Sequence, residues 1–138
     1  VGGMLGLTPT QIEDRIPQIT EFADIKNILD RHLGAAPGST RQKLAWSIAM
    51  SLDARFYVID QTLVVGERDF RQKCWTHVDQ LREQGATFLI SSDNSKVYRR
   101  FCDRALFFNQ GQLEADTTVP EALALARKAR NTARETED

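Results

Sequence analysis

The stretch FYVIDQ, residues 56–61, combines an apolar run with two polar side chains at its end. Its first four residues are aromatic or β-branched and the run is too short for a helix, so it predicts a buried strand. ATFLISS, residues 86–92, predicts a second buried strand. Ligands of open α/β sheets bind beyond the carboxyl ends of the strands. The polar residues at these two ends therefore indicate either a ligand site or two turns that need solvation: Asp60, Gln61, Ser91, Ser92 and Asp93.

Each of these two strands is followed in the sequence by a predicted helix. Residues 67–85 form a long amphipathic pattern with acid at its start and Gly85 as its stop signal, and residues 94–102 form a short basic helix. Residues 104–116 read as a hairpin that turns at NQGQ, residues 109–112, and residues 119–131 as a last helix. This order predicts an α/β fold, with a parallel sheet wound by right-handed crossovers and a hairpin at its edge. The charged tail that follows is expected to fray.

The amino-terminal third also carries helical signals. In residues 8–25, Thr8 is a candidate cap, Pro9 a first helical residue followed by an acidic first turn, and Pro17 is expected to kink or split the helix. A second short helix is expected near residues 24–32. The loop LGAAPGST then leads into a helix capped by Ser39 or Thr40. The expected apolar face of that helix consists of Leu44, Ala45, Ile48, Ala49 and Leu52.

Composition limits the classes of function. The chain has 138 residues, of which 41% are hydrophobic and 27% charged, with a net charge of -1. These values predict one soluble globular domain and no long-range field for nucleic acid or anionic lipid. No run reaches the roughly 20 apolar residues that cross a bilayer, and the first residues lack the order of a signal peptide. We therefore expect a cytoplasmic protein and, because the chain does not begin with Met, a piece of a longer one.

Several chemically distinctive residues have structural explanations. Cys74 and Cys102 are predicted to be buried free thiols, because their spacing matches no metal motif. Trp46 and Trp75 are predicted to lie in the core. The histidines lack triad partners and are interpreted as surface or boundary residues. The basic cluster after the second strand is consistent with phosphate contact or a solvated helix face, of which the second is commoner: Lys96, Arg99 and Arg100.

Three segments taken together resemble a known family: residues 39–74, residues 81–95 and residues 101–116. They look like the second half of an ABC transporter ATP-binding subunit, of the branch that exports capsular polysaccharide and lipopolysaccharide O-antigen. VGERDFRQKC, residues 65–74, and FCDRA, residues 101–105, are the most specific pieces. The resemblance implies a P-loop NTPase-like fold in three parts. These are a partial helical subdomain at residues 1–36, the carboxyl-terminal part of the nucleotide-binding core at residues 37–129, and a charged tail at residues 130–138.

The family's catalytic positions carry over to the two strand ends. Asp60 matches the Walker B aspartate, which holds magnesium through water. Gln61 matches the glutamate that accepts a proton from the attacking water, and an amide cannot act as that general base near neutral pH. Asp93 matches the switch histidine and places an anion toward the γ-phosphate. Ser92 keeps the family residue. The resemblance thus implies binding with impaired hydrolysis.

The signature loop and the D-loop carry over with changes. APGST, residues 36–40, stands at the signature, where Pro37 replaces the expected hydroxyl while Gly38, Ser39 and Thr40 keep a helix start that suits an anion. In the D-loop, Gly66 matches and Glu67 replaces an aspartate. The helical segment of residues 9–30 resembles the family's docking surface for a membrane subunit, although an internal packing stripe explains the same residues.

One family element is absent from these 138 residues. No G-x-x-x-x-G-K-[ST] phosphate loop occurs, so ATP and magnesium are expected only if that loop is supplied from elsewhere. The first hypothesis is an ATP-binding component of a polysaccharide exporter, peripheral at the inner face of the cell membrane. It would pair with itself or an intact homologue, dock on a membrane-spanning subunit and bind no nucleic acid. The alternative is a non-catalytic interaction module derived from this fold. A third hypothesis is a likeness of architecture alone.

Overall fold

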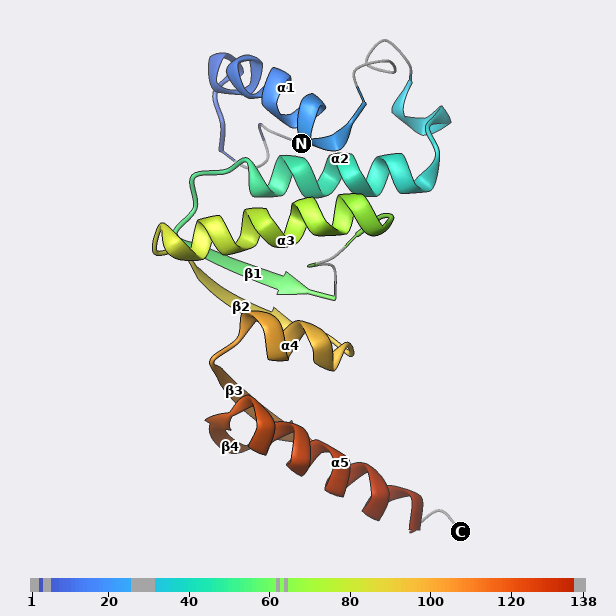
Figure 1. The fold of residues 1–138 in the computed structure, drawn as a ribbon, viewed down its shortest axis with the longest axis vertical. Helices are drawn as coiled ribbons and strands as arrows, with labels where there is room; N and C mark the ends of the chain where they lie inside the picture. The colour runs from blue at the N-terminus through green and yellow to red at the C-terminus, as the bar shows by residue number, and fades with distance from the viewer. Residues whose placement is uncertain (1–2, 4–5, 26–31, 62, 64, 136–138) are drawn as a thin grey trace. The chain divides into compact units, whose positions relative to one another are not determined.

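The computed structural model describes residues 3, 6–25, 32–61, 63 and 65–135 (Figure 1). Two compact units share the chain, and each is described by itself. The first contains Val1–Tyr57 and Val64–Thr87, and the second contains Val58–Leu63 and Phe88–Asp138. In the described part of the chain, no helix combines the length and the apolar character that a bilayer crossing requires.

The first unit begins with α1, Pro9–Ala23, whose start is fixed by a capping box. The Gln11 backbone N–H donates to Thr8 Oγ1 at 3.3 Å, and the Thr8 N–H donates to Gln11 Oε1 at 2.9 Å. Thr8 and Pro9 are therefore confirmed as cap and first residue. The expected acidic first turn is wrong, because the acids begin one turn later. The predicted split at Pro17 is also wrong, since α1 continues through it to Ala23.

The end of α1 is a left-handed residue, Asp24, with φ 56° and its N–H donating to carbonyls of the last turn. The helix predicted near residues 24–32 falls mostly outside the described residues. A short 3-10 turn, η3, Leu33–Ala35, precedes the next helix.

Helix α2, Gly38–Met50, packs between α1 and α3, Arg68–Glu83, as Figure 1 shows within this unit. An aromatic cluster joins the three helices. Phe22 stacks on Trp46 with ring centroids 5.3 Å apart, and Phe70 meets both rings edge-on. Trp46 is 5% exposed, which confirms its place in the core. These ring contacts fix the packing of α1, α2 and α3.

The predicted apolar face of α2 is correct only in part, because Leu44, Ile48 and Leu52 are half-buried. The buried residues of this helix are Trp46, Ser47 and Met50, whereas Ala45 and Ala49 are exposed. The large side chains of Trp46 and Met50 gain more from burial than two alanines do, so the helix turns them inward. Trp75 is half-buried, so its predicted place in the core is also wrong.

Strands β1, Phe56–Asp60, and β2, Thr87–Ser91, pair in parallel. The Thr87 N–H donates to Arg55 O at 2.8 Å where both strands start, and the Gln61 N–H donates to Ser91 O at 2.7 Å where both end. Helix α3 is the crossover between them. The two predicted strands and their parallel arrangement are confirmed.

The second unit continues with α4, Ser95–Phe101, and with the antiparallel hairpin of β3, Arg104–Asn109, and β4, Gln112–Thr118. Gln110 and Gly111 form its two-residue turn with φ values of 48° and 77°, which confirms the predicted hairpin. Its predicted place at the edge of the parallel sheet is wrong, because among the described strands β3 and β4 form a sheet separate from that of β1 and β2. Helix α5, Val119–Glu135, packs on the hairpin. Because α5 runs to Glu135, the predicted fraying is wrong for residues 132–135.

Candidate functional site

Gln61 occupies an unusual backbone position at the end of β1. Its φ is 61°, in the left-handed region that costs a residue with a side chain about 1–3 kcal/mol. Two contacts hold it there. The Gln61 N–H donates to Ser91 O at 2.7 Å, and Gln61 Oε1 accepts a hydrogen bond from the Asp93 N–H at 3.3 Å. The turn after β1 is thereby tied to the loop after β2.

Asp60 precedes Gln61 as the last residue of β1, and its side chain is exposed. Among the described residues, no group of three or more His, Cys, Asp and Glu side chains is placed to hold a metal ion. Mg²⁺ often takes one or two protein carboxylates and fills its other positions with water and substrate phosphates, so a single carboxylate such as that of Asp60 is chemically compatible with it. The magnesium role of Asp60 stays a prediction.

The loop after β2 is held by a local network. The Ser92 N–H donates to the Tyr98 hydroxyl at 2.6 Å, and that hydroxyl donates to the Ser92 carbonyl. Ser92 Oγ accepts from the Asn94 N–H at 3.1 Å. Asn94 Oδ1 in turn accepts from the Lys96 N–H at 3.1 Å and caps α4. Sequence reasoning missed Tyr98 as the residue that fixes this loop.

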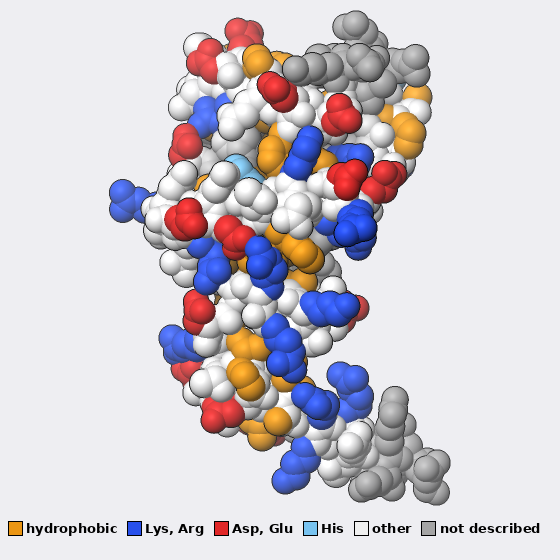
Figure 2. Space-filling model, viewed as in Figure 1, with side chains coloured by type: hydrophobic (Ala, Val, Ile, Leu, Met, Phe, Trp, Pro, Cys, Tyr) orange, Lys and Arg blue, Asp and Glu red, His pale blue; other side chains and the backbone are white. Residues whose placement is uncertain are grey.

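Asp93 and the basic cluster of α4 face solvent. The Asp93 side chain is exposed, while its backbone N–H is bound by Gln61. Lys96, Arg99 and Arg100 are exposed on α4. Basic side chains gather over α4 and α5 on the face drawn in Figure 2. The exposure of these cations is consistent with both interpretations, phosphate contact and a solvated helix face.

The segment predicted as the signature lies in the first unit, at the start of α2. Pro37 is the N-cap with φ -53° and ψ 148°, and it makes no side-chain capping hydrogen bond. The predicted cap by Ser39 or Thr40 is wrong: both lie in the first helical turn after Gly38. Because proline offers no side-chain acceptor, this helix start has no side-chain cap on its first N–H groups.

Gly66 and Glu67, also in the first unit, lie just before α3. Gly66 has φ 75°, and a Cβ there would lie 3.1 Å from Phe70 Cδ1 and 3.3 Å from Lys43 Cε. The backbone angle favours glycine, and an added Cβ would press on the Phe70 and Lys43 side chains. Glu67 is the exposed N-cap of α3 and makes no side-chain capping hydrogen bond.

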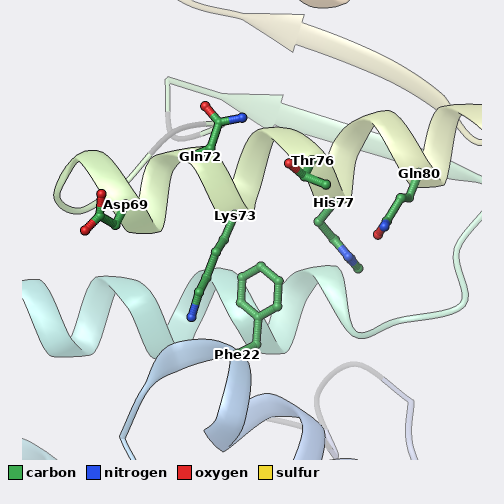
Figure 3. Close-up of a pocket in the computed structure, with 7 residues that line it drawn as sticks. All are labelled: Phe22, Asp69, Gln72, Lys73, Thr76, His77 and Gln80. Carbon is green, nitrogen blue, oxygen red and sulfur yellow. The ribbon is translucent and has the colours of Figure 1, made fainter.

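The first unit also contains a groove that sequence reasoning missed. Figure 3 shows Phe22 rising from α1 toward α3, with Lys73 and His77 extending from α3 toward α1. The groove encloses about 330 Å³. His77 Nε2 lies 3.1 Å from Met50 O, which anchors the ring as a boundary residue. The complete lining consists of Phe22, Asp69, Gln72, Lys73, Thr76, His77 and Gln80.

The second unit therefore brings Asp60, Gln61, Ser92 and Asp93 to one pair of strand ends, as the sequence predicts. Pro37, Gly38, Ser39, Thr40, Gly66 and Glu67 belong to the first unit. The catalytic and binding roles assigned to all ten residues stay predictions. This end of the sheet therefore presents three chemical groups. They are the Asp60 carboxylate, which suits a hard cation, the Gln61 amide, which is held by the loop after β2, and the exposed Asp93 carboxylate.

Comparison with curated proteins identifies relatives among ABC transporter proteins. The chain is 32% identical over 121 residues to the teichoic acids export ATP-binding protein TagH of Staphylococcus saprophyticus, which covers 85% of this chain and 46% of TagH. It is 30% identical over 112 residues to the ABC transporter protein AbcA of Aeromonas salmonicida, covering 81% of this chain and 36% of AbcA. TagH of Bacillus cereus is 29% identical over 123 residues, covering 89% of this chain and 22% of that protein. No protein-family model matches the chain.

Solved structures show the same fold. An ATP-binding subunit of an ABC transporter superposes with a TM-score of 0.73 at 19% identity, over 87% of this chain and 50% of that one. The dimeric ATP-binding cassette MJ0796, bound to ADP and Pi, gives 0.63 at 16% identity, over 82% and 49%. The chain thus spans less than half the length of these curated relatives and about half of these solved chains. Its fold is the α/β, P-loop NTPase-like fold of ABC ATPase domains, which confirms the predicted fold class.

Proposed function

We propose that this chain is the carboxyl-terminal part of the nucleotide-binding domain of an ABC-type exporter of a cell-surface polymer, impaired in hydrolysis. The observation that carries the proposal is the pairing of Asp60 and Gln61 with the Ser92 and Asp93 loop at two parallel strand ends of an ABC ATPase fold. The names of TagH and AbcA support an exporter component. Capsular polysaccharide or O-antigen as the cargo rests on the sequence resemblance alone.

The chemistry of the site follows from its side chains. Magnesium supplies charge neutralisation for the phosphates, and Asp60 is the carboxylate that would hold its water shell. Gln61 can donate a hydrogen bond to a water and accept one from it, but it cannot take up the proton that attack on a phosphate releases. The Gln61 side-chain oxygen also accepts from the Asp93 N–H. Nucleotide binding without efficient turnover is the expected result.

The first unit would serve a second nucleotide held by a partner subunit. At the start of α2, Gly38, Ser39 and Thr40 present backbone N–H groups without a side-chain cap, and a helix start attracts anions. Pro37 contributes no N–H and no hydroxyl there. Gly66 and Glu67 take the D-loop positions. This arrangement requires a dimer, either of two copies or with an intact homologue.

The proposed location and partners follow from the same role. The subunit would lie at the cytoplasmic face of the membrane and bind a membrane-spanning transporter subunit, and it would bind no nucleic acid. ATP and magnesium would bind only when a phosphate loop is supplied, since the 138 residues contain none.

A second candidate is a non-catalytic interaction module. The hydrogen bond from the Asp93 N–H to Gln61 Oε1 favours it, because it joins the two predicted catalytic positions at which the sequence departs from the family. A chain that had lost nucleotide use would tolerate such a structural contact in place of catalytic groups.

Calorimetric titration of magnesium-ATP into the longest natural polypeptide that contains this chain distinguishes the two candidates. The nucleotide-binding proposal predicts saturable binding that needs magnesium and weakens at least tenfold in Asp60→Asn. Asp69→Asn on the exposed start of α3 is the matched control, and its binding should not change. Absence of binding in that polypeptide would favour the interaction module.

A further inference from the structure

Three consecutive backbone N–H groups after β2 are bound by side chains of the protein itself. The Ser92 N–H donates to the Tyr98 hydroxyl at 2.6 Å. The Asp93 N–H donates to Gln61 Oε1 at 3.3 Å. The Asn94 N–H donates to Ser92 Oγ at 3.1 Å. All five residues belong to the second unit, so this network holds within one compact body.

The start of α4 is closed in the same way. Asn94 is its N-cap, and Asn94 Oδ1 accepts from the Lys96 N–H at 3.1 Å. The Val97 N–H donates to Asn94 O at 2.9 Å. Proteins often bind phosphate through free backbone N–H groups in a loop or at a helix start. Here the N–H groups of residues 92–94, 96 and 97 each have an acceptor already, so none of them is available to a phosphate.

The exposed side chains at the two strand ends are acids and an amide. Asp60, Gln61 and Asp93 are all exposed. Asp60 is the predicted magnesium ligand, so its charge would be neutralised by the metal. The Gln61 amide oxygen is bound to the Asp93 N–H. The Asp93 carboxylate remains as a negative charge at this end of the sheet, and it repels a further negative group placed beside it.

The basic residues of α4 are the groups that would offset this charge. Lys96, Arg99 and Arg100 are exposed. The Arg100 guanidinium lies over the Phe101 ring, 5.2 Å from its centroid, which directs it to an aromatic face. Lys96 follows Asp93 by three residues and is the cation closest to it in sequence. A lysine ammonium is strongly hydrated and sits on a flexible stem, so its attraction for a phosphate in solvent is weak.

We infer that the nucleotide site does not favour a nucleoside triphosphate over a diphosphate, and that Asp93 removes the preference. The inference rests on the proposed function, under which Asp93 stands at the switch position, toward the terminal phosphate. The loop offers that phosphate no N–H group from residues 92–94 and opposes its charge with a carboxylate. A diphosphate lacks the terminal phosphate and escapes both effects. The ligand class is therefore a nucleoside diphosphate bound at least as tightly as the triphosphate.

Calorimetric titration of two nucleotides tests this directly. Magnesium-ADP and the magnesium complex of the non-hydrolysable triphosphate AMP-PNP are titrated into the longest natural polypeptide that contains this chain. We expect a Kd for AMP-PNP equal to or higher than that for ADP. Asp93→Asn should tighten AMP-PNP about fivefold, the effect of removing one like charge about 4 Å away in water, and leave ADP unchanged. Asp69→Asn on the exposed start of α3 is the matched control and should change neither Kd.

Lys96→Gln separates repulsion by Asp93 from attraction by the basic cluster, and it should change neither Kd. Weaker binding of AMP-PNP alone in Lys96→Gln overturns the inference, because a cation would then hold the terminal phosphate. A preference of about tenfold or more for AMP-PNP in the natural sequence also overturns it, as does an unchanged Kd in Asp93→Asn. Absence of binding by both nucleotides contradicts the proposed function itself, a result distinct from a triphosphate preference.

Backbone hydrogen exchange tests the loop independently of affinity. Tyr98→Phe should speed exchange of the Ser92 amide about tenfold, because it removes the acceptor of that N–H. Tyr57→Phe is the matched control, since its hydroxyl donates to Leu52 O at 2.7 Å, and it should leave the Ser92 amide unchanged. Saturating AMP-PNP should not slow exchange of the amides of residues 92–94. Slower exchange there, or an unchanged Ser92 amide in Tyr98→Phe, overturns the inference.

Discussion

The Asp93 backbone N–H donates a hydrogen bond to Gln61 Oε1, with 3.3 Å between the two atoms. These are the two residues at which the sequence departs from the catalytic pattern of the family it resembles. Gln61 reaches Asp93 from a left-handed backbone position, with φ 61°. The Gln61 side chain thus helps to fix the loop that contains Asp93, and under the proposed function these two residues stand at the positions of the general base and the switch histidine.

Replacing Gln110 by glycine should stabilise the protein. Gln110 has φ 48° in the hairpin turn, where glycine relieves backbone strain. We expect Gln110→Gly to raise the free energy of unfolding by about 1 kcal/mol, as measured by urea denaturation. Gln61→Gly relieves a similar strain but loses the contact to Asp93, worth about 1 kcal/mol, and should be nearly neutral. Equal stabilisation by both variants would contradict a structural role for the Gln61 side chain.

Gly66→Ala should destabilise the protein more than Gly111→Ala. Both glycines have positive φ, 75° and 77°, so both alanines pay a backbone cost of roughly 1 kcal/mol. Only at Gly66 would the added Cβ also meet Phe70 and Lys43, while the space at Gly111 is open. We expect an extra cost of about 1–2 kcal/mol at Gly66, measured by thermal and urea unfolding. Equal costs would show that the Phe70 and Lys43 side chains move away from the added Cβ without a measurable loss of stability.

The Trp46 ring should contribute far more to stability than the Trp75 ring. Trp46 is 5% exposed and contacts the rings of Phe22, Phe70 and His77. Its replacement by alanine should cost about 3–5 kcal/mol. Trp75 is half-buried, and Trp75→Ala should cost less. Urea denaturation of both variants gives the comparison, and Trp46→Phe, which keeps a ring, should recover part of the loss.

Cys74 should resist alkylation in the folded protein. Burial raises the pKa of its thiol to about 12, so the reactive thiolate is scarce at pH 8. Cys102 is half-buried and should react with iodoacetamide first, as followed by mass spectrometry. Unfolding in urea should equalise the two rates. Prompt modification of Cys74 in the native protein would contradict its complete burial.

The same thiol gives a pH dependence of stability. Its folded pKa lies above the unfolded value near 9.0, so the folded state favours the protonated form. The associated stability is fully present below pH 9 and is lost as pH rises from there toward 12. Cys74→Ala should remove this part of the alkaline decline, measured by urea denaturation at pH 8 and pH 10. An unchanged decline in Cys74→Ala would assign it to other groups.

Local signals in the sequence predicted much of the fold. The Thr8 and Pro9 start of α1, both parallel strands and the turn at Gln110 and Gly111 depend on residues close in sequence, and the structure contains them. The buried face of α2 was not predictable in this way. Trp46 turns inward because Phe22 and Phe70, from two other helices, surround it. Periodicity within one helix contains no information about those partners.

In the candidate site, too, local features were predicted from the sequence and contacts between distant residues were not. The sequence predicted that Asp60, Gln61, Ser92 and Asp93 lie together, because the carboxyl ends of parallel strands meet at the same edge of a sheet. The left-handed turn at Gln61 and its contact with Asp93 were not predicted, since both depend on pairing across 32 positions of sequence. Tyr98 was missed for a similar reason: its hydroxyl bonds Ser92 only after α4 folds back on the loop.

Restoration of hydrolysis tests the central claim most directly. The steady-state ATPase rate is measured in the longest natural polypeptide containing this chain, for the natural sequence and for Gln61→Glu combined with Asp93→His. Gln80→Glu on the exposed face of α3 serves as a control that adds the same carboxylate elsewhere. The account predicts negligible turnover in the natural sequence and the control, and a rise of about 100-fold or more in the double variant, because a general base typically contributes 10²–10⁴-fold. Rapid hydrolysis by the natural sequence, or no gain in a double variant that still binds magnesium-ATP, would contradict it.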